Sequence, residues 1–359
     1  MDQWVTSNEA CDRLGIRPQT LYAYVSRGRL SRRIDRGRSF FDVRELDRLA
    51  ARTRRAGRAG RLEVLIDTEI TLLDRRGALS YRGVDVAEIA ATWSFERTAE
   101  WLWSGVDGDP PSWEAPADWV TLAHGAVGER PGDRLRVAAA AIAGAADRDV
   151  RAVAPVGRAL VPALVEALPR IGRPANDPSV AAELWARLTK LAPNPERLRI
   201  LNASLVLLAD HEMAVSTVAA RVAASAWAAP VACVLAGLAA HSGVLHGGVS
   251  SVVVDALRRG DDVSRWAGHV VYEGEDPRSV ALLALLDETP ATRAVSQVPR
   301  ANIDMVMAAM AIDFRMIDGA AEAIFAIARV AGWLAHAAEE YERPFRFRPR
   351  ASYVGPPVR

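Results

Sequence analysis

A run of 33 residues without Asp, Glu, Lys or Arg, from Val222 to Val254, constrains the fold of this 359-residue chain most strongly. About 18 or more uncharged apolar residues can form a membrane-spanning helix. Here Pro230 and the segment HSGVLHGGVSS, residues 241–251, interrupt the run with a helix breaker, two histidines and a Gly-Gly pair. We therefore predict a helix buried in a globular body, followed by a turn at Gly247 and Gly248, and no membrane span.

Size and composition indicate more than one domain. Single hydrophobic cores stop growing at about 250–300 residues, and 50% of this sequence is hydrophobic, which excludes a fibrous or disordered chain. The two cysteines, Cys11 and Cys233, lie far apart, so we expect neither a disulfide framework nor a cysteine-based metal site. Together with an N-terminus that lacks the pattern of a secretory signal, this predicts a cytoplasmic protein.

Charge is distributed unevenly along the chain. The net charge is +1, but residues 1–61 contain 15 Arg and 7 Asp or Glu, a local charge of +8, so the remaining 298 residues carry −7. This asymmetry is typical of an anion-binding segment attached to a mildly acidic body.

The basic segment has the pattern of two short helices and a wing. Thr6 and Glu9 form a capping box, Gly15 ends the first helix, Pro18 begins the second and Gly28 ends it. The stretch LSRRIDRGRSFFD then predicts a two-stranded hairpin that turns at residues 36–38. We assign residues 1–55 to this domain and the Gly- and Arg-rich residues 56–61 to a linker.

Residues 3–55 resemble the winged helix-turn-helix of MerR-like and excisionase-like proteins. The resemblance implies that the second helix enters the major groove of DNA and that the wing touches the backbone. The residues expected to contact DNA are Arg17, Gln19, Thr20, Tyr22, Arg27, Arg36 and Arg38. A solvated basic face that binds another protein is the alternative.

The rest of the chain is predicted to be mainly α-helical. A hairpin is expected first, with strands at 70–73 and 78–81 around the turn DRRG. Apolar residues then recur at helical spacing, including one stretch from Ser204 to Trp227. Neither a G-x-G-x-x-G motif after a strand nor a Walker lysine is present, so the common nucleotide-binding motifs do not apply.

Ionisable residues recur within this apolar context. A buried charge without a partner costs several kcal/mol, so either each of these residues is satisfied individually in the core or they converge on one site. The set consists of His211, His246, His269, Arg278, Asp304 and Arg329.

Residues 62–359 resemble the citrate synthase family in several ordered segments. These are LLDRRGALSYRGVDVAEIA, ADHEMAVSTVAARV, SGVLHGGVSS, GHVVYEGEDPR, NIDMVMA, FAIARVAGWLAH and RPRASYVG. The resemblance implies a mainly α fold, with a large domain at 62–249 and 311–359 and a small domain at about 250–310. It also implies that the His211 segment is a buried helix.

The resemblance further implies an acyltransferase that condenses acetyl-CoA or propionyl-CoA with oxaloacetate, without a metal or other cofactor. Asp304 would be the base, His246 would stabilise the enol and His269 would polarise the ketone. The carboxylates of oxaloacetate would be bound by His211, Arg278, Arg329 and, from the partner subunit of a homodimer, Arg348.

The sequence departs from the family pattern around the proposed small domain. Only 22 residues separate His246 from His269, and 34 separate His269 from Asp304, which predicts a shortened small domain. The usual H-G-G-A-N is here His246-Gly-Gly-Val-Ser250, and a polar pair after the N-V-D step is replaced by Val306 and Met307.

These departures leave two alternatives open. One is a DNA-binding transcription regulator that uses the body as a sensor of oxaloacetate, citrate or an acyl-CoA. The other is a heteromer with a full-length paralogue. The presence of His246, His269 and Asp304 favours the enzyme.

Overall fold

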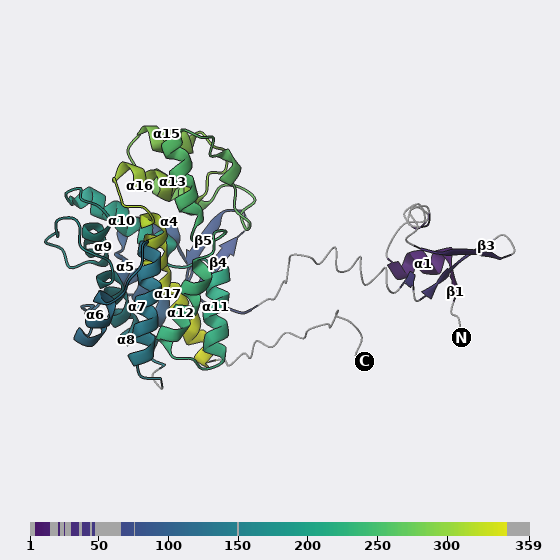
Figure 1. Ribbon diagram of the computed structural model, residues 1–359, viewed down its shortest axis with the longest axis horizontal. Helices are drawn as coiled ribbons and strands as arrows, with labels where there is room; N and C mark the ends of the chain where they lie inside the picture. The colour runs from purple at the N-terminus through teal and green to yellow at the C-terminus, as the bar shows by residue number, and fades with distance from the viewer. Residues whose placement is uncertain are drawn as a thin grey trace. The chain divides into compact units, whose positions relative to one another are not determined.

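The computed structural model describes residues 4–14, 21, 25, 30–35, 38–43, 45–46, 66–74, 76–148 and 151–342. The chain divides into two compact units, Met1–Asp67 and Thr68–Arg359 (Figure 1). The predicted linker at 56–61 lies outside the described residues.

The first unit contains an antiparallel sheet and a helix. Strands β1 (Trp4–Thr6), β3 (Arg38–Asp42) and β2 (Arg32–Asp35) lie in that order, and β1 runs into α1 (Ser7–Leu14). The predicted wing hairpin is confirmed, with Asp35 opposite Arg38. So is the capping box, because the Thr6 amide donates to the Glu9 carboxylate at 2.8 Å. The pairing of β1 with β3 was not predicted, since three residues give too short a pattern.

The second unit opens with the predicted hairpin. Strands β4 (Thr71–Asp74) and β5 (Ala78–Tyr81) pair antiparallel with Thr71 opposite Tyr81, and β6 (Val84–Asp85) adds to β5. Tyr81 is buried, and its hydroxyl donates to the carbonyl of Asp210 at 3.0 Å. The hairpin is thereby fixed to the segment that carries the predicted site residue His211.

Helices form most of the remaining described chain, as predicted. They are α4 (Val86–Thr92), α5 (Phe95–Ser104), α6 (Ala117–His124), α7 (Pro131–Ala145), α8 (Val153–Glu166), α9 (Val180–Leu188), α10 (Pro195–Leu208), α11 (Val215–Ser225), α12 (Pro230–His241), α13 (Val249–Arg259), the 3-10 turn η1 (Ser264–Trp266), α14 (Pro277–Leu283), α15 (Pro290–Ser296), α16 (Ile303–Asp313) and α17 (Ala320–Glu342).

Helix α17 is the central helix of the second unit. It contacts α5, α7, α8, α10, α11 and α12. Its length and apolar composition would allow it to cross a membrane, but its most apolar window is 100% buried by the surrounding helices. Burial of this kind is typical of a core helix.

The uncharged run folds as a buried helix and a turn, which confirms the prediction. Pro230 begins α12, which packs against α7, α11 and α17 and ends at His241. The chain then turns through residues 242–248 before α13 begins. Pro230 occupies the first helical turn, where its missing N–H has no cost.

Short helices occupy the region between His246 and Asp304. Within it lie α13, η1, α14 and α15, and α13, α15 and α16 gather at one end of the second unit (Figure 1). We propose that this region forms the small domain expected at about 250–310. Helix α16 runs to Asp313, so the proposed domain would end there.

Helix α17 approaches the segment after α10 so closely that only glycine fits at position 332. The Gly332 amide donates to the Ala209 carbonyl at 3.0 Å. A Cβ atom on Gly332 would lie 2.3 Å from Asp210 Oδ1 and 2.5 Å from the Ala209 carbonyl oxygen. One of the two segments would have to move.

Gly332→Ala is therefore expected to lower the free energy of unfolding by about 1–3 kcal/mol, the usual cost of overpacking. Gly144→Ala is the matched control, because a Cβ on Gly144 in α7 meets nothing within 4 Å. Alanine also favours a helix over glycine. Urea unfolding of both variants measures the effect. Equal unfolding midpoints for the two variants would show that α17 does not pack closely against the Ala209–Asp210 segment.

Candidate active site

His211 lies in a break between α10 and α11, and not on a helix as the resemblance implied. The helix ends because the Asp210 carboxylate accepts hydrogen bonds from the Glu212 amide at 2.9 Å and from Thr71 Oγ1 at 2.6 Å. Glu212 adopts a left-handed conformation with φ of 53°. The continuous helical pattern expected from Ser204 to Trp227 is therefore wrong at residues 209–214.

Two predicted site residues, His211 and His269, meet at this break. Their rings are 4.9 Å apart, and His211 Nε2 lies 2.9 Å from the hydroxyl of Tyr272. Burial, together with the positive charge of Arg278, lowers the pKa of His211 well below its ordinary value. His211 is therefore a neutral hydrogen-bonding group at pH 7.

His269 presents one defined ring nitrogen as a donor. Burial, helped by Arg278, lowers its pKa to about 4, so the ring is neutral at pH 7. The Val271 amide donates to Nδ1 at 3.2 Å. A neutral imidazole carries a single proton, so that proton is on Nε2, which is free to donate to a ligand.

The loop that carries His269 is held to the start of α16. The Gly268 amide donates to the carbonyl of Arg300, and the Arg300 guanidinium donates to the Tyr272 carbonyl at 3.0 Å. Asn302, the N-cap of α16, donates to the Gly268 carbonyl at 2.8 Å. These hydrogen bonds therefore fix the His269 loop to the helix that carries Asp304.

His246 is half-buried in the turn after α12. Its Nε2 lies 2.8 Å from Ser216 Oγ on α11. Burial lowers its pKa to about 4, and the positive charge of Arg329 adds to the shift. A neutral ring that accepts the Ser216 proton at Nε2 carries its own proton on Nδ1, where it can stabilise negative charge on a ligand oxygen.

The glycine after His246 is required by close packing and not by a left-handed backbone conformation. Neither Gly247 nor Gly248 has a positive φ. A Cβ on Gly247 would instead lie 2.2 Å from the His241 ring. His241 is buried, and burial lowers its pKa to about 3.

Gly247→Ala is therefore expected to displace the His246 turn and to lower stability by about 1–3 kcal/mol. In a His241→Ala background the same substitution is expected to cost much less, because the opposing ring is gone. A double-mutant cycle of unfolding free energies measures this coupling. If the losses in unfolding free energy from Gly247→Ala and His241→Ala are additive, the proposed contact between Gly247 and the His241 ring is wrong.

Asp304 lies in the first turn of α16 and is half-buried. Burial raises its pKa to about 6, although the hydrogen bond from Ser250 and the charges of Arg278 and Arg329 oppose the shift. Its Oδ1 accepts a hydrogen bond from Ser250 Oγ at 2.9 Å. A carboxylate with a raised pKa is a stronger proton acceptor than an ordinary aspartate.

The two predicted arginines have different surroundings. Arg278 forms a buried bidentate pair with Asp276, at 2.9 Å through Nε and 2.8 Å through Nη2. Asp276 also accepts from the Ile303 amide at 3.2 Å. Arg278 therefore has only Nη1 outside this pair.

Arg329 on α17 is fully buried, and its Nε donates to the Leu208 carbonyl at 2.8 Å. Both Nη atoms lack a hydrogen-bond partner among the described residues. Burial lowers the pKa of Arg329 to about 10, so it remains charged at pH 7. A buried cation with two unused donors is costly unless an anion pairs with it, which indicates a carboxylate-binding site.

Several residues of this cluster were missed by the sequence reasoning. Ser216, Ser250 and Asp276 lie within the segments that carry the family resemblance, and Arg300 lies close to one of them, but no role was assigned to any of the four. Only Asp276 could have been found from the local sequence, because an Asp before a Pro is a typical helix N-cap.

Arg348 and six of the residues expected to contact DNA lie outside the described residues. The six are Arg17, Gln19, Thr20, Tyr22, Arg27 and Arg36. Arg38 is exposed at the start of β3.

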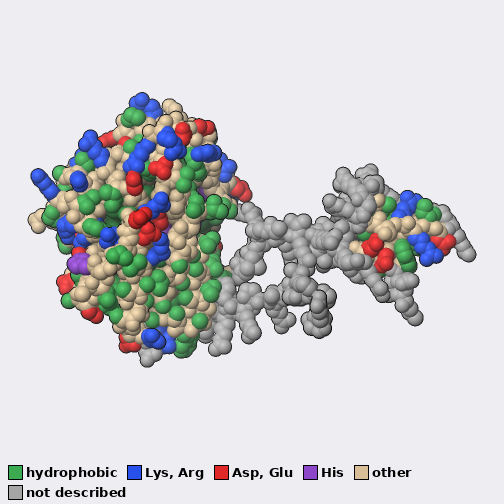
Figure 2. Space-filling model, viewed as in Figure 1, with side chains coloured by type: hydrophobic (Ala, Val, Ile, Leu, Met, Phe, Trp, Pro, Cys, Tyr) green, Lys and Arg blue, Asp and Glu red, His purple; other side chains and the backbone are tan. Residues whose placement is uncertain are grey.

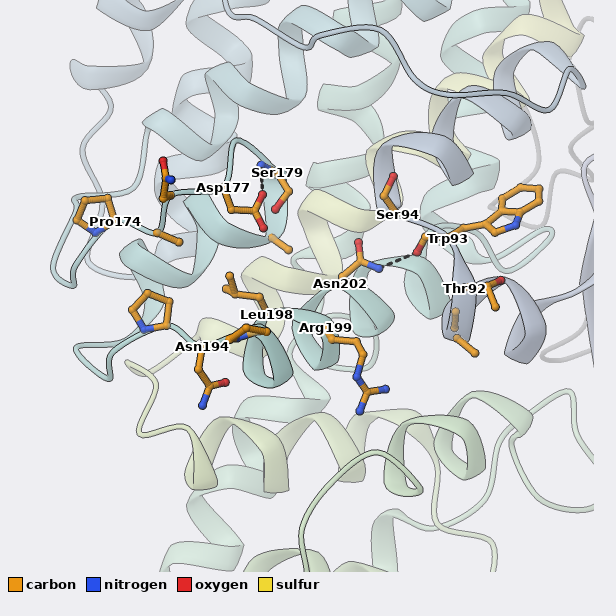
Figure 3. Close-up of a pocket in the computed structure, with 17 residues that line it drawn as sticks. Thr92, Trp93, Ser94, Pro174, Asp177, Ser179, Asn194, Leu198, Arg199 and Asn202 are labelled. Carbon is orange, nitrogen blue, oxygen red and sulfur yellow. Dashed lines mark hydrogen bonds between the residues drawn. The ribbon is translucent and has the colours of Figure 1, made fainter.

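A cavity of about 850 Å³ elsewhere in the second unit does not contain this cluster (Figure 3). It is lined by the C-terminal end of α4, by the N-cap residues of α5, α9 and α10, and by Arg199 and Asn202. The cap residues Ser94, Ser179 and Asn194 already accept from the helix amides. None of the predicted site residues lines this cavity, so we take the histidine cluster as the candidate active site.

Comparison with protein families gives two matches. A model described as citrate synthase, C-terminal domain, matches residues 62–350, and a helix-turn-helix domain model matches residues 4–54.

Several relatives carry related names. Citrate synthase 2 of Bacillus subtilis is 28% identical over 239 residues, which are 55% of this chain and 64% of that protein. Putative citrate synthase 2 of Mycobacterium tuberculosis is 33% identical over 46% of this chain and 53% of that protein. The chain thus spans between half and two thirds of these relatives. The citrate synthase of Acidithiobacillus ferridurans is 27% identical over 78% of this chain and 90% of its own.

Solved structures agree with the fold. Citrate synthase from Thermotoga maritima superposes with a TM-score of 0.68 at 26% identity, over 82% of this chain and 94% of its own. The Thermoplasma acidophilum enzyme, solved with carboxymethyl coenzyme A and oxaloacetate, gives a TM-score of 0.66 at 22% identity, over 82% and 95% of the two chains. The second likeness concerns the fold alone.

Proposed function

Because this chain belongs to the citrate synthase family, we propose that its second unit is an acyltransferase that condenses acetyl-CoA or propionyl-CoA with oxaloacetate. The observation that carries the proposal is Arg329, a buried guanidinium with two unused donors near Asp304 and a group of neutral histidines. A dianionic substrate would satisfy those donors.

The proposed chemistry begins with proton abstraction. Asp304 would take a proton from the carbon next to the thioester carbonyl, and the Nδ1–H of His246 would stabilise the enol oxygen that forms. The enol carbon would then attack the keto carbon of oxaloacetate, while the Nε2–H of His269 donates to the developing alkoxide. Hydrolysis of the thioester would release CoA thiol and the tricarboxylate.

The carboxylates of oxaloacetate would be bound by guanidinium groups from separate elements. Arg329 offers its two Nη atoms and Arg278 its Nη1, while His211 adds a neutral contact. Arg348 of the partner subunit would complete the site, as in the family that the sequence resembles. Planar guanidinium groups suit such bidentate recognition.

An apolar face supports a homodimer. Helices α7, α11 and α12 lie side by side, and hydrophobic side chains cover much of the lower part of the second unit (Figure 2). Val137 on α7 and Val222 on α11 are 40% and 41% exposed, and α12 carries no Asp, Glu, Lys or Arg. Large exposed apolar patches are typical of protein interfaces.

Sedimentation of Val222→Asp tests the dimer. We expect a monomer for the variant and a dimer for the native chain, and a native monomer would contradict the proposal. A native chain that dimerises only with a full-length paralogue would instead support the heteromer.

The experiment that tests the function is CoA thiol release from acetyl-CoA and from propionyl-CoA. Release is expected to require oxaloacetate and to fall by about 10²–10³-fold in His246→Ala, the usual cost of losing one donor to a developing oxyanion. If neither thioester gives oxaloacetate-dependent release, the proposal is wrong.

DNA binding by the first unit is a second proposed function, supported by the helix-turn-helix match at 4–54 and the local charge of +8. In a homodimer the two units would suit a palindromic site with half-sites about 34 Å apart. Binding to upstream DNA is expected to weaken steeply with salt. If oxaloacetate changes the affinity for DNA and no turnover occurs, the second unit acts as a sensor. If the chain does not bind DNA, the proposed DNA-binding function is wrong.

A further inference from the structure

Ser250 connects the turn that carries His246 with the helix that carries Asp304. It lies in the first turn of α13, is 1% exposed, and donates from Oγ to Asp304 Oδ1 at 2.9 Å. Helices α13 and α16 pack against each other. On the basis of the proposed function, we propose that Ser250 is a positioning residue that holds the Asp304 carboxylate toward the substrate.

No other described side chain shares this task. Arg278, Arg329 and Asp276 act on Asp304 through their charges, but Arg278 donates to Asp276 and Arg329 to the Leu208 carbonyl, and neither is hydrogen-bonded to Asp304. The neighbouring Ile303 amide donates to Asp276. A carboxylate with one hydrogen bond has one oxygen fixed and the other available to accept a proton.

Geometry explains why one hydroxyl matters. A base that must reach a carbon-bound proton is sensitive to its position, and a misplacement of about 1 Å can cost on the order of 10²-fold in rate. Without Ser250 the Asp304 carboxylate could rotate about its terminal torsion, which has broad minima. The Ser250 hydrogen bond removes that freedom and also stabilises the ionised form.

The adjacent residue provides a matched control. Ser251 Oγ is buried without a hydrogen-bond partner among the described residues. Ser251 lines a separate cavity of about 280 Å³ together with Val254, Arg258 and residues 316–321. The two serines thus share a helix and a size, but only Ser250 contacts Asp304.

The test compares Ser250→Ala, Ser250→Thr and Ser251→Ala in the full chain. Ser250→Ala is expected to lower kcat by about 10- to 100-fold, to leave KM for oxaloacetate unchanged, and to move the acid limb of the kcat profile to higher pH. Ser250→Thr, which keeps a hydroxyl, should recover most of the rate. Ser251→Ala should match the native chain.

A second readout does not need turnover. Titration of the Asp304 carboxyl by ¹³C NMR, assigned with Asp304→Asn, should give a higher pKa in Ser250→Ala than in the native chain or in Ser251→Ala. If Ser250→Ala equals Ser251→Ala in rate, pH profile and NMR titration, the inference is overturned. If the native chain is inactive while the NMR pKa still rises, the proposed function fails and the Ser250–Asp304 contact stands.

Discussion

Asp304→Asn is expected to lower kcat by about 10²–10⁴-fold, the usual contribution of a general base. The amide keeps the shape of the side chain and can still accept the hydrogen bond from Ser250, but it cannot take up the α-proton. KM for oxaloacetate should change little, because the carboxylates are bound by other residues. The rate is measured as CoA thiol release.

The same substitution should not destabilise the fold, which separates a catalytic effect from misfolding. The pKa of Asp304 is raised to about 6, so the protonated form is favoured in the folded state and stability is lost as the pH rises through 6. Asn removes this cost, so the Tm of Asp304→Asn at pH 8 should equal or exceed that of the native chain. The difference should vanish below about pH 4. Nearly native turnover, or a lower Tm at pH 8, would contradict this account of Asp304.

Arg329→Met is expected to weaken oxaloacetate binding by about 2–5 kcal/mol, the range for loss of one partner of a buried charge pair. The two Nη donors of Arg329 have no partner among the described residues, so the bound carboxylate would supply their hydrogen bonds. Titration calorimetry with oxaloacetate measures the loss.

Without ligand, the stability of Arg329→Met should match or exceed that of the native chain, because an unpaired buried charge has been removed. Oxaloacetate should raise the Tm of the native chain by mass action and raise that of the variant much less at the same concentration. Lys190→Met is a suitable control, since Lys190 is exposed. Native affinity in Arg329→Met would show that the carboxylate site lies elsewhere.

Much of the fold could be predicted because its signals are local. The wing hairpin, the opening hairpin at Thr71–Tyr81 and the buried helix from Pro230 follow from alternation, turn residues and the absence of charge. The resemblance also selected His211, His246 and His269, and the structure places each of them beside a hydrogen-bonding partner.

The remainder depends on contacts between segments far apart in the chain. Helix α10 ends at Leu208, and Thr71 and Tyr81 bind the Asp210 segment that follows it. The local sequence pattern does not predict this break. Gly247 is required by the His241 ring and Gly332 by Ala209 and Asp210. The pairing of Ser250 with Asp304 also arises only when α13 packs on α16.

Formation of a carbon–carbon bond is the central claim, and the fate of [2-¹³C]acetyl-CoA tests it most directly. In the presence of oxaloacetate, ¹³C NMR should show the label in a methylene carbon of citrate, and propionyl-CoA labelled at the same carbon should give 2-methylcitrate if it is a substrate. Labelled acetate or propionate alone, or unchanged thioester, would contradict the account.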